Sequence, residues 1–166
     1  MRNKLLILGG LAIVGLAVFY LLRSEVPAPQ ATFTTLTGQR LALADLKGKV
    51  VIVNFWATSC PGCIAEMPDL IRTHNAFHAR GLETVAVAMS YDPPAYVLSY
   101  AQRNKLPFTV ALDLKGEAAR VFGDIKLTPT TFVIDKTGNI IQKTVGILDF
   151  PKLHTILRKE LAKQGE

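Results

Sequence analysis

Cys60 and Cys63 are the only cysteines in the 166-residue chain, and Pro61 and Gly62 separate them. A disulfide between them would close so short a loop that it would restrict the unfolded chain little, which argues against a purely structural staple. Two thiols at this spacing can instead cycle between a dithiol and a disulfide. The pair therefore predicts thiol–disulfide exchange, with Cys60 and Cys63 as the catalytic residues and the redox-active disulfide.

The surroundings of the pair predict different roles for the two thiols. An apolar run at 49–55 precedes Cys60 and an amphipathic pattern follows from Pro61, so Cys60 should lie where a buried strand meets the N-terminus of a helix. Unpaired N–H groups and the helix dipole favour a thiolate there, which makes Cys60 the predicted nucleophile. Cys63, on the same helical face, is the predicted resolving thiol. Pro61 suits the first helical turn because no N–H bond is lost there.

Two histidines offer the cysteines a metal-binding alternative. With His74 and His78 the pair spells C-x2-C-x10-H-x3-H, close to the spacing of zinc fingers. A finger needs its cysteines on a hairpin and its histidines on a separate helix, whereas all four residues fall here on one predicted helix, with His74 about 16 Å from Cys63. We therefore expect no metal and no cofactor, with His74 on the packed stripe of the helix and His78 on its solvent side.

The elements that position the pair alternate between strand and helix. A strand–helix–strand crossover of this length pairs strands in parallel, whereas the turn at 136–139 makes the next strand antiparallel. The fold class is therefore α/β, a mixed central sheet with helices on both faces. The predicted elements are an N-terminal hairpin at 33–43, strands at 49–55, 84–89, 108–112, 130–134 and 140–145, and helices at 61–80 (kinked at Pro68), 93–105 and 116–122, with a last helix capped by Asp149.

The N-terminus carries a hydrophobic segment. Leu5 to Leu22 is 18 residues without a charge, which at about 1.5 Å per residue just spans a thin hydrocarbon core. We expect residues 1–23 to be an uncleaved, single-pass signal anchor; the alternative is a cleaved signal peptide, which would have a shorter apolar region and a clearer cleavage site. Both export the rest of the chain, because Arg2 and Lys4 hold the N-terminus in the cytoplasm.

We predict a short linker and one domain in the remaining chain. Residues 24–32, with Pro27 and Pro29, should form an extended linker, and residues 33–166 are long enough for one packed core. Half of the net charge of +6 lies on Arg2, Lys4 and Arg23 around the leader, since residues 24–166 carry 16 Lys and Arg against 13 Asp and Glu, a balance of only +3. This balance argues against a nucleic-acid partner.

Three motifs surround the cysteine pair: Asn-Phe-Trp at 54–56, Pro68 five residues after Cys63, and Thr-Pro-Thr-Thr-Phe-Val-Ile-Asp at 128–135. Together with the pair they resemble the thioredoxin superfamily, in particular its membrane-anchored TlpA/ResA-like branch. The resemblance covers residues 33–162 and implies a thioredoxin-like fold with a central insertion that includes 93–105.

The resemblance also implies the substrate-facing residues. It implies that Pro129 is cis and faces the cysteine pair, and that the backbone at Thr128 binds the substrate chain. Trp56, Pro61 and Gly62 are expected to support the site or contact the substrate.

The chain departs from the family pattern at the residue that moves protons. Asn54 stands where thioredoxins place a buried aspartate, and an amide cannot act as a base. The resemblance implies that members of the branch often use an acid near the insertion, which makes Asp92 a candidate proton relay; the alternative is that Asp92 is a plain turn residue. Glu66 is a weaker candidate, because an acid on a helix surface is usually solvated. Ser59 and Ile64 replace a common aromatic and a common basic residue, which concerns affinity and redox tuning.

The resemblance implies a reductase in the bacterial inner membrane, with its domain on the periplasmic side. It would keep thiols of exported proteins reduced, for cytochrome c maturation or oxidase copper-site assembly, with electrons from a membrane thiol transporter. Two alternatives remain open. One is an oxidase that forms disulfides with the same site, and the other is a copper-binding or delivery module, although copper-delivery relatives space their cysteines three residues apart.

Overall fold

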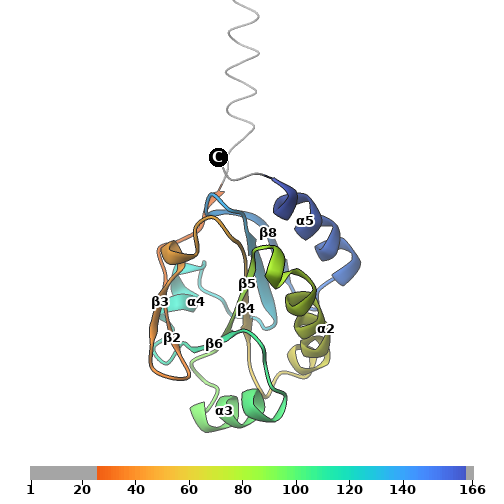
Figure 1. The fold of residues 1–166 in the computed structure, drawn as a ribbon. Helices are drawn as coiled ribbons and strands as arrows, with labels where there is room; N and C mark the ends of the chain where they lie inside the picture. The colour runs from red at the N-terminus through yellow and green to blue at the C-terminus, as the bar shows by residue number, and fades with distance from the viewer. Residues whose placement is uncertain (1–25, 164–166) are drawn as a thin grey trace, which may run out of the picture.

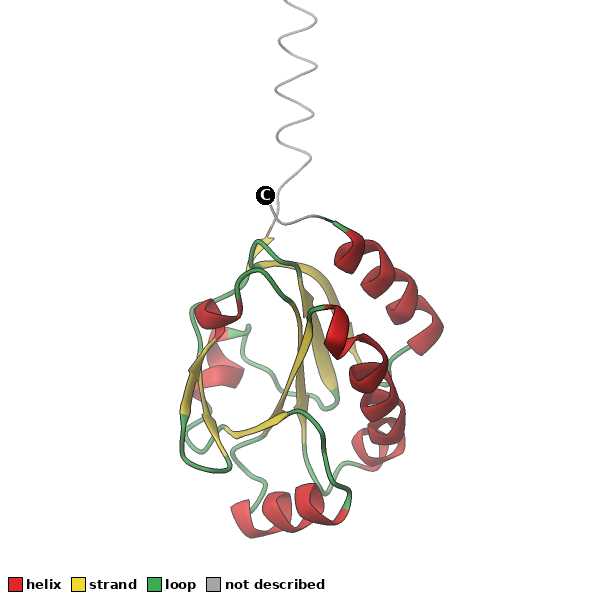
Figure 2. Ribbon diagram, viewed as in Figure 1, coloured by secondary structure: helices red, strands yellow, loops and turns green. Residues whose placement is uncertain are grey.

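The computed structural model describes residues 26–163, and these form one mixed eight-stranded sheet in the order β1-β8-β7-β4-β5-β6-β2-β3, with helices on both faces (Figures 1 and 2). The strands are β1 (Val26–Pro27), β2 (Thr32–Thr35), β3 (Arg40–Ala42), β4 (Val50–Trp56), β5 (Leu82–Ala88), β6 (Thr109–Leu112), β7 (Thr130–Ile134) and β8 (Asn139–Val145). The helices are η1 (Leu43–Leu46), α2 (Pro61–Phe77), η2 (His78–Arg80), α3 (Pro94–Arg103), α4 (Glu117–Val121) and α5 (Phe150–Ala162).

Strand β4 is the centre of the sheet, as its continuous apolar sequence predicts. All seven of its residues are buried, because it pairs in parallel with β5 on one side and antiparallel with β7 on the other. Its alternate side chains enter two different cores. Val50 and Ile52 pack in the core that α2 and α5 cover, and Val51 and Val53 pack in the core that α4 covers. Both expectations for this strand, central and doubly buried, are confirmed.

The insertion and the N-terminal hairpin are built as predicted. Strand β2 pairs antiparallel with β3 to make the hairpin and with β6 to join it to the sheet. Helix α3 and strand β6 together follow β5, and α3 lies at the end of the sheet where β4 and β5 finish (Figure 1). The insertion therefore places a helix beside the carboxyl ends of the central parallel strands, where ligands bind in open α/β sheets.

The structure differs from the expected linker at 24–32. Val26 pairs with Ile140 and Pro27 with Asn139, and Ala28 N–H donates to the Gly138 carbonyl at 2.9 Å. An edge strand tolerates Pro27 because its missing N–H costs no interior ladder bond. The predicted anchor at 1–23 lies outside the described residues. Within 26–163 no helix is both long and apolar enough to cross a bilayer.

His74 and His78, which the zinc-finger alternative would need as ligands, have other partners. His74 is buried, with Nδ1 3.2 Å from Thr84 Oγ1 and its ring edge-on to Phe108. His78 Nδ1 donates to the Leu82 carbonyl at 3.1 Å. The prediction that His74 belongs to the packed stripe of the helix is confirmed. Within residues 26–163, no three Cys, His, Asp or Glu side chains cluster so as to hold a metal ion.

Candidate active site

Cys60 lies at the junction that the sequence predicts. It is the N-cap of α2, and its Sγ accepts a hydrogen bond from Cys63 N–H at 3.2 Å. A disulfide joins Cys60 to Cys63, whose Cα atoms are 5.3 Å apart. Cys60 is partly exposed, whereas Cys63 is 0% exposed. This difference in access fits an outer nucleophile and an inner resolving thiol.

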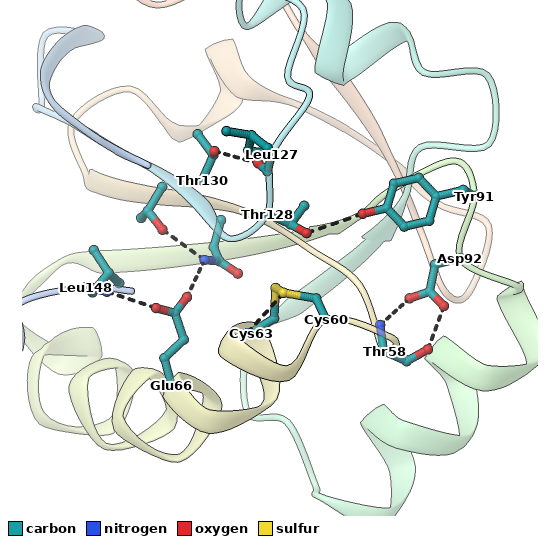
Figure 3. Close-up of a disulfide and its surroundings, with 12 residues drawn as sticks. Thr58, Cys60, Cys63, Glu66, Tyr91, Asp92, Leu127, Thr128, Thr130 and Leu148 are labelled. Carbon is teal, nitrogen blue, oxygen red and sulfur yellow. Dashed lines mark hydrogen bonds between the residues drawn. A yellow bond between two sulfur atoms is a disulfide. The ribbon is translucent and has the colours of Figure 1, made fainter. Parts of the chain in front are cut away.

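The cis peptide expected between Thr128 and Pro129 is present. It faces the start of α2, since a Cβ atom added to Gly62 would lie 3.6 Å from Pro129 Cδ and 3.4 Å from Ile147 Cγ1. Glycine at 62 therefore keeps the space between the helix and these two side chains open. Tyr91 Oη lies 3.3 Å from Thr128 Oγ1 (Figure 3), which ties the loop after β5 to the same turn.

Glu66 lies one turn after Cys63 on α2, and its carboxylate is buried, with 2% of the residue exposed. Oε1 accepts from Asn54 Nδ2 at 3.1 Å, and Oε2 accepts from Leu148 N–H at 3.0 Å (Figure 3). Burial raises the pKa of Glu66 above its usual range, and the two donated hydrogen bonds oppose that rise only in part. The expectation that Glu66 is an ordinary solvated acid is wrong, because the face of α2 that carries Cys63 points into the core.

Asn54 organises this carboxylate from the neighbouring strand. The residue is buried, and its Nδ2 donates both to Glu66 and to Thr131 Oγ1, the latter at 2.9 Å. The buried acid of this site is therefore on the helix, and the strand contributes the amide that donates to it. The sequence contained a signal for this: residues 63, 66, 70, 73 and 77 recur at helical spacing on one face.

Asp92 is also buried, with 3% of the residue exposed, but its carboxylate accepts hydrogen bonds from a different residue, Thr58. Its Oδ2 accepts from Thr58 N–H and its Oδ1 from Thr58 Oγ1, each at 2.6 Å. Figure 3 shows the carboxylate turned toward Thr58. Asp92 therefore holds the loop between β4 and Cys60. Thr58 could not be predicted from the sequence, since a threonine in a loop carries no pattern of its own.

Trp56 supports the site from beneath. Its side chain is 0% exposed and therefore not accessible to a substrate, and its ring packs against Tyr100 of α3 with centroids 5.3 Å apart. Pro61 is exposed beside the half-buried Cys60, and Ser59 is exposed just before it. The side chains next to the pair are therefore small, which leaves Cys60 accessible to a protein substrate.

The Redoxin family model matches residues 23–157. The chain belongs to the Redoxin family. This redoxin is 36% identical over 132 residues to the thiol-disulfide oxidoreductase ResA of Bacillus thuringiensis subsp. konkukian, which covers 80% of this chain and 75% of the relative. Its matched length and its cysteine pair make it a ResA-like thiol–disulfide oxidoreductase of the thioredoxin superfamily.

Solved structures agree with this assignment. A thioredoxin-family thiol:disulfide interchange protein from Chlorobium tepidum superposes with a TM-score of 0.75 at 32% identity, covering 83% of this chain and 97% of that one. StoA from Bacillus subtilis superposes with a TM-score of 0.66 at 28% identity, covering 78% and 98%. The redoxin therefore shares the thioredoxin-like fold over nearly the whole length of both relatives.

Proposed function

We propose that this redoxin reduces disulfides of exported proteins, with Cys60 as nucleophile, Cys63 as resolving thiol and Glu66 as the proton acceptor of Cys63. The observation that carries the proposal is the buried carboxylate of Glu66 one helical turn from the buried Cys63. A buried thiol needs a local base to become a thiolate, because water cannot take its proton.

The proposed cycle balances two electrons and two protons. The Cys60 thiolate attacks one sulfur of the substrate disulfide, that bond breaks, and the released substrate thiolate takes up a proton from water. Glu66 then accepts the proton of Cys63, and the Cys63 thiolate attacks Cys60 Sγ. The second substrate sulfur leaves as a thiolate and takes up a proton from water, Glu66 releases its proton to water, and the redoxin is left with the Cys60–Cys63 disulfide.

The same proposal assigns the redoxin to the outer side of the bacterial inner membrane. The uncharged run at 5–22 behind Arg2 and Lys4 supports a single-pass anchor, with the catalytic domain in the periplasm. A membrane thiol transporter would then return the site to the dithiol state. Proteins of cytochrome c maturation or of oxidase copper-site assembly are the proposed substrates, which follows from the resemblance to the TlpA/ResA-like branch.

Trapping tests the exchange mechanism. In Cys63→Ser the mixed disulfide on Cys60 cannot resolve, so a covalent complex with the natural partner should accumulate and should disappear on treatment with dithiothreitol. Cys60→Ser is the matched control, because it keeps one buried thiol and removes the exposed nucleophile. Recovery of equal amounts of complex from both variants, or of none from Cys63→Ser, would contradict the proposal.

The reduction potential tests the direction. A reductase should have a potential near that of thioredoxin, about −270 mV, whereas a strong oxidase such as DsbA lies near about −120 mV. Equilibration of the Cys60–Cys63 pair with glutathione buffers measures this value. A potential close to that of DsbA would replace the reductase with the disulfide-forming alternative.

A further inference from the structure

A groove lies beside the redox pair, and nothing in the exchange mechanism uses it. It has a volume of about 330 Å³ and is lined by Thr58, Ile64, Tyr96, Ser99, Tyr100 and Arg103. Thr58 comes two residues before Cys60 and Ile64 directly after Cys63, so one wall of the groove belongs to the redox site. The other four residues come from α3, the helix of the central insertion. We call this the α3 groove.

The α3 groove has an apolar, aromatic surface on a fixed support. Tyr96 is 64% exposed, so its ring is available to a partner. Tyr100 is half-buried, and its ring packs on the fully buried Trp56. Because Trp56 is the last residue of β4, this contact links the groove to the strand that leads to Cys60.

The only charged side chain that lines the α3 groove is Arg103. Its Nε donates to the Ser99 carbonyl within the helix at 3.3 Å, and Arg103 belongs to none of the ion pairs among residues 26–163. Among the described residues no acid lines the groove, and neither of the buried acids of the site, Glu66 and Asp92, forms an ion pair with Arg103. The groove therefore offers a positive charge without a carboxylate of its own.

We propose that the α3 groove binds the polypeptide segment next to the reactive cysteine of the substrate protein, with preference for an apolar side chain close to a carboxylate. The apolar side chain lies against Tyr96, Tyr100 and Ile64, and the carboxylate pairs with Arg103. The carboxylate is proposed because Arg103 offers a positive charge that no acid of the groove balances. A segment next to the reactive cysteine is proposed because Thr58 and Ile64 join the groove to the redox site. This inference rests on the proposed exchange with protein substrates, and it assigns substrate choice to the insertion.

Peptide reduction tests the proposal. The substrates are synthetic peptides with one internal disulfide and a leucine beside it, and with Glu, Gln or Lys placed two to five residues from the reactive cysteine. At low salt the wild type should reduce the best Glu peptide with a kcat/KM about three- to fivefold above that of its Lys counterpart, the size expected for one exposed ion pair. The preference should shrink as salt screens the pair.

Charge reversal gives the decisive comparison. Arg103→Glu should invert the preference for Glu over Lys peptides while leaving the Gln peptide unchanged. Lys152→Glu is the matched control, because it makes the same charge change at an exposed residue of α5 that does not line the groove. Tyr96→Ser should lower kcat/KM for the leucine peptides relative to glycine peptides. A wild type that does not discriminate, or a Lys152→Glu shift as large as that of Arg103→Glu, would overturn the proposal.

A binding measurement separates this proposal from the proposed function. Peptides with both cysteines replaced by serine cannot react, and NMR titration should still show the Tyr96 and Arg103 signals moving more with Glu peptides than with Lys peptides. If the peptides bind in this way but their disulfides are not reduced, the proposed reductase activity is contradicted and the proposed binding in the α3 groove stands. If the peptides are reduced without any preference or shift, the reductase activity stands and the proposed binding in the α3 groove is contradicted.

Discussion

At the scale of single residues, Glu66 and Asp92 are two buried acids that accept hydrogen bonds from different donors and have different predicted roles. Each carboxylate accepts two hydrogen bonds, but Glu66 accepts them from Asn54 and the Leu148 backbone, whereas Asp92 accepts both from Thr58. Glu66 shares the helix face of Cys63, and burial raises the pKa of Glu66. A carboxylate that is easier to protonate than usual is a better base for a thiol, because the proton transfer is less uphill.

Glu66→Gln should slow the resolving step. Glutamine has nearly the same shape but cannot accept a proton, so release of substrate from the mixed disulfide should fall by about 10²-fold, the low end for loss of a general base. The wild-type rate of this step should fall as pH is lowered through the raised pKa of Glu66, because the base must be ionised. Stopped-flow measurement of the step against pH checks both points. Asp69→Asn is the control, because Asp69 lies on the same helix but is half-exposed. Equal slowing by both variants would refute a specific role of Glu66 as proton acceptor.

The same carboxyl should make stability depend on pH. Since the pKa of Glu66 is raised in the folded protein, the native state holds this proton more tightly than the unfolded chain does. The stability that Glu66 contributes is therefore full below its unfolded pKa and is lost as pH rises through its folded pKa. Urea unfolding of the oxidised protein should show the wild type losing stability relative to Glu66→Gln between acidic and neutral pH. A constant difference across that range would contradict the assignment.

Asp92→Asn should affect position rather than proton transfer. An amide can accept only one of the two Thr58 hydrogen bonds, and its NH2 group would face the other donor, so we expect a loss of about 1–3 kcal/mol in the free energy of unfolding. Because the loop before Cys60 loosens, the reaction should slow while its pH profile stays that of the wild type. A pH profile that loses its acidic limb in Asp92→Asn, and keeps it in Glu66→Gln, would make Asp92 the relay instead.

At the scale of elements, the sequence predicts what depends on local pattern and misses what depends on contacts across the chain. The apolar run of β4, the spacing on α2 and the turn before β8 each determine their element locally. Strand β1 was missed because two residues with a proline carry no strand pattern, and only pairing with β8 makes them one. Glu66 does share a helix face with buried residues, but an acid is buried only where partners receive its carboxylate, and those partners, Asn54 and Leu148, are 12 and 82 residues away in the chain.

At the scale of the whole molecule, helix α3 gives the redox site a second neighbour. The cis-proline turn and Ile147 border the pair at Gly62, and Thr58 and Ile64 connect it to the insertion. A substrate segment across Cys60 can therefore touch both the cis-proline turn and the exposed side chains of α3. The exchange chemistry belongs to the cysteine pair, whereas α3 adds contacts beside it, so the two can be tested by separate substitutions.

The last expectation concerns how the whole chain is held in the cell. With residues 1–23 present, the redoxin should remain with the membrane fraction after carbonate washing, and protease added to spheroplasts should digest its domain, because an 18-residue uncharged run behind two basic residues inserts with its N-terminus inside. A variant that begins at residue 24 behind a cleavable export signal is the control. It should be released with the periplasmic contents and reduce peptide disulfides at the wild-type rate, since every residue of the site follows residue 53. If the protein expressed with residues 1–23 is recovered in the periplasmic fraction with a shortened N-terminus, the leader is cleaved and the predicted anchor is contradicted.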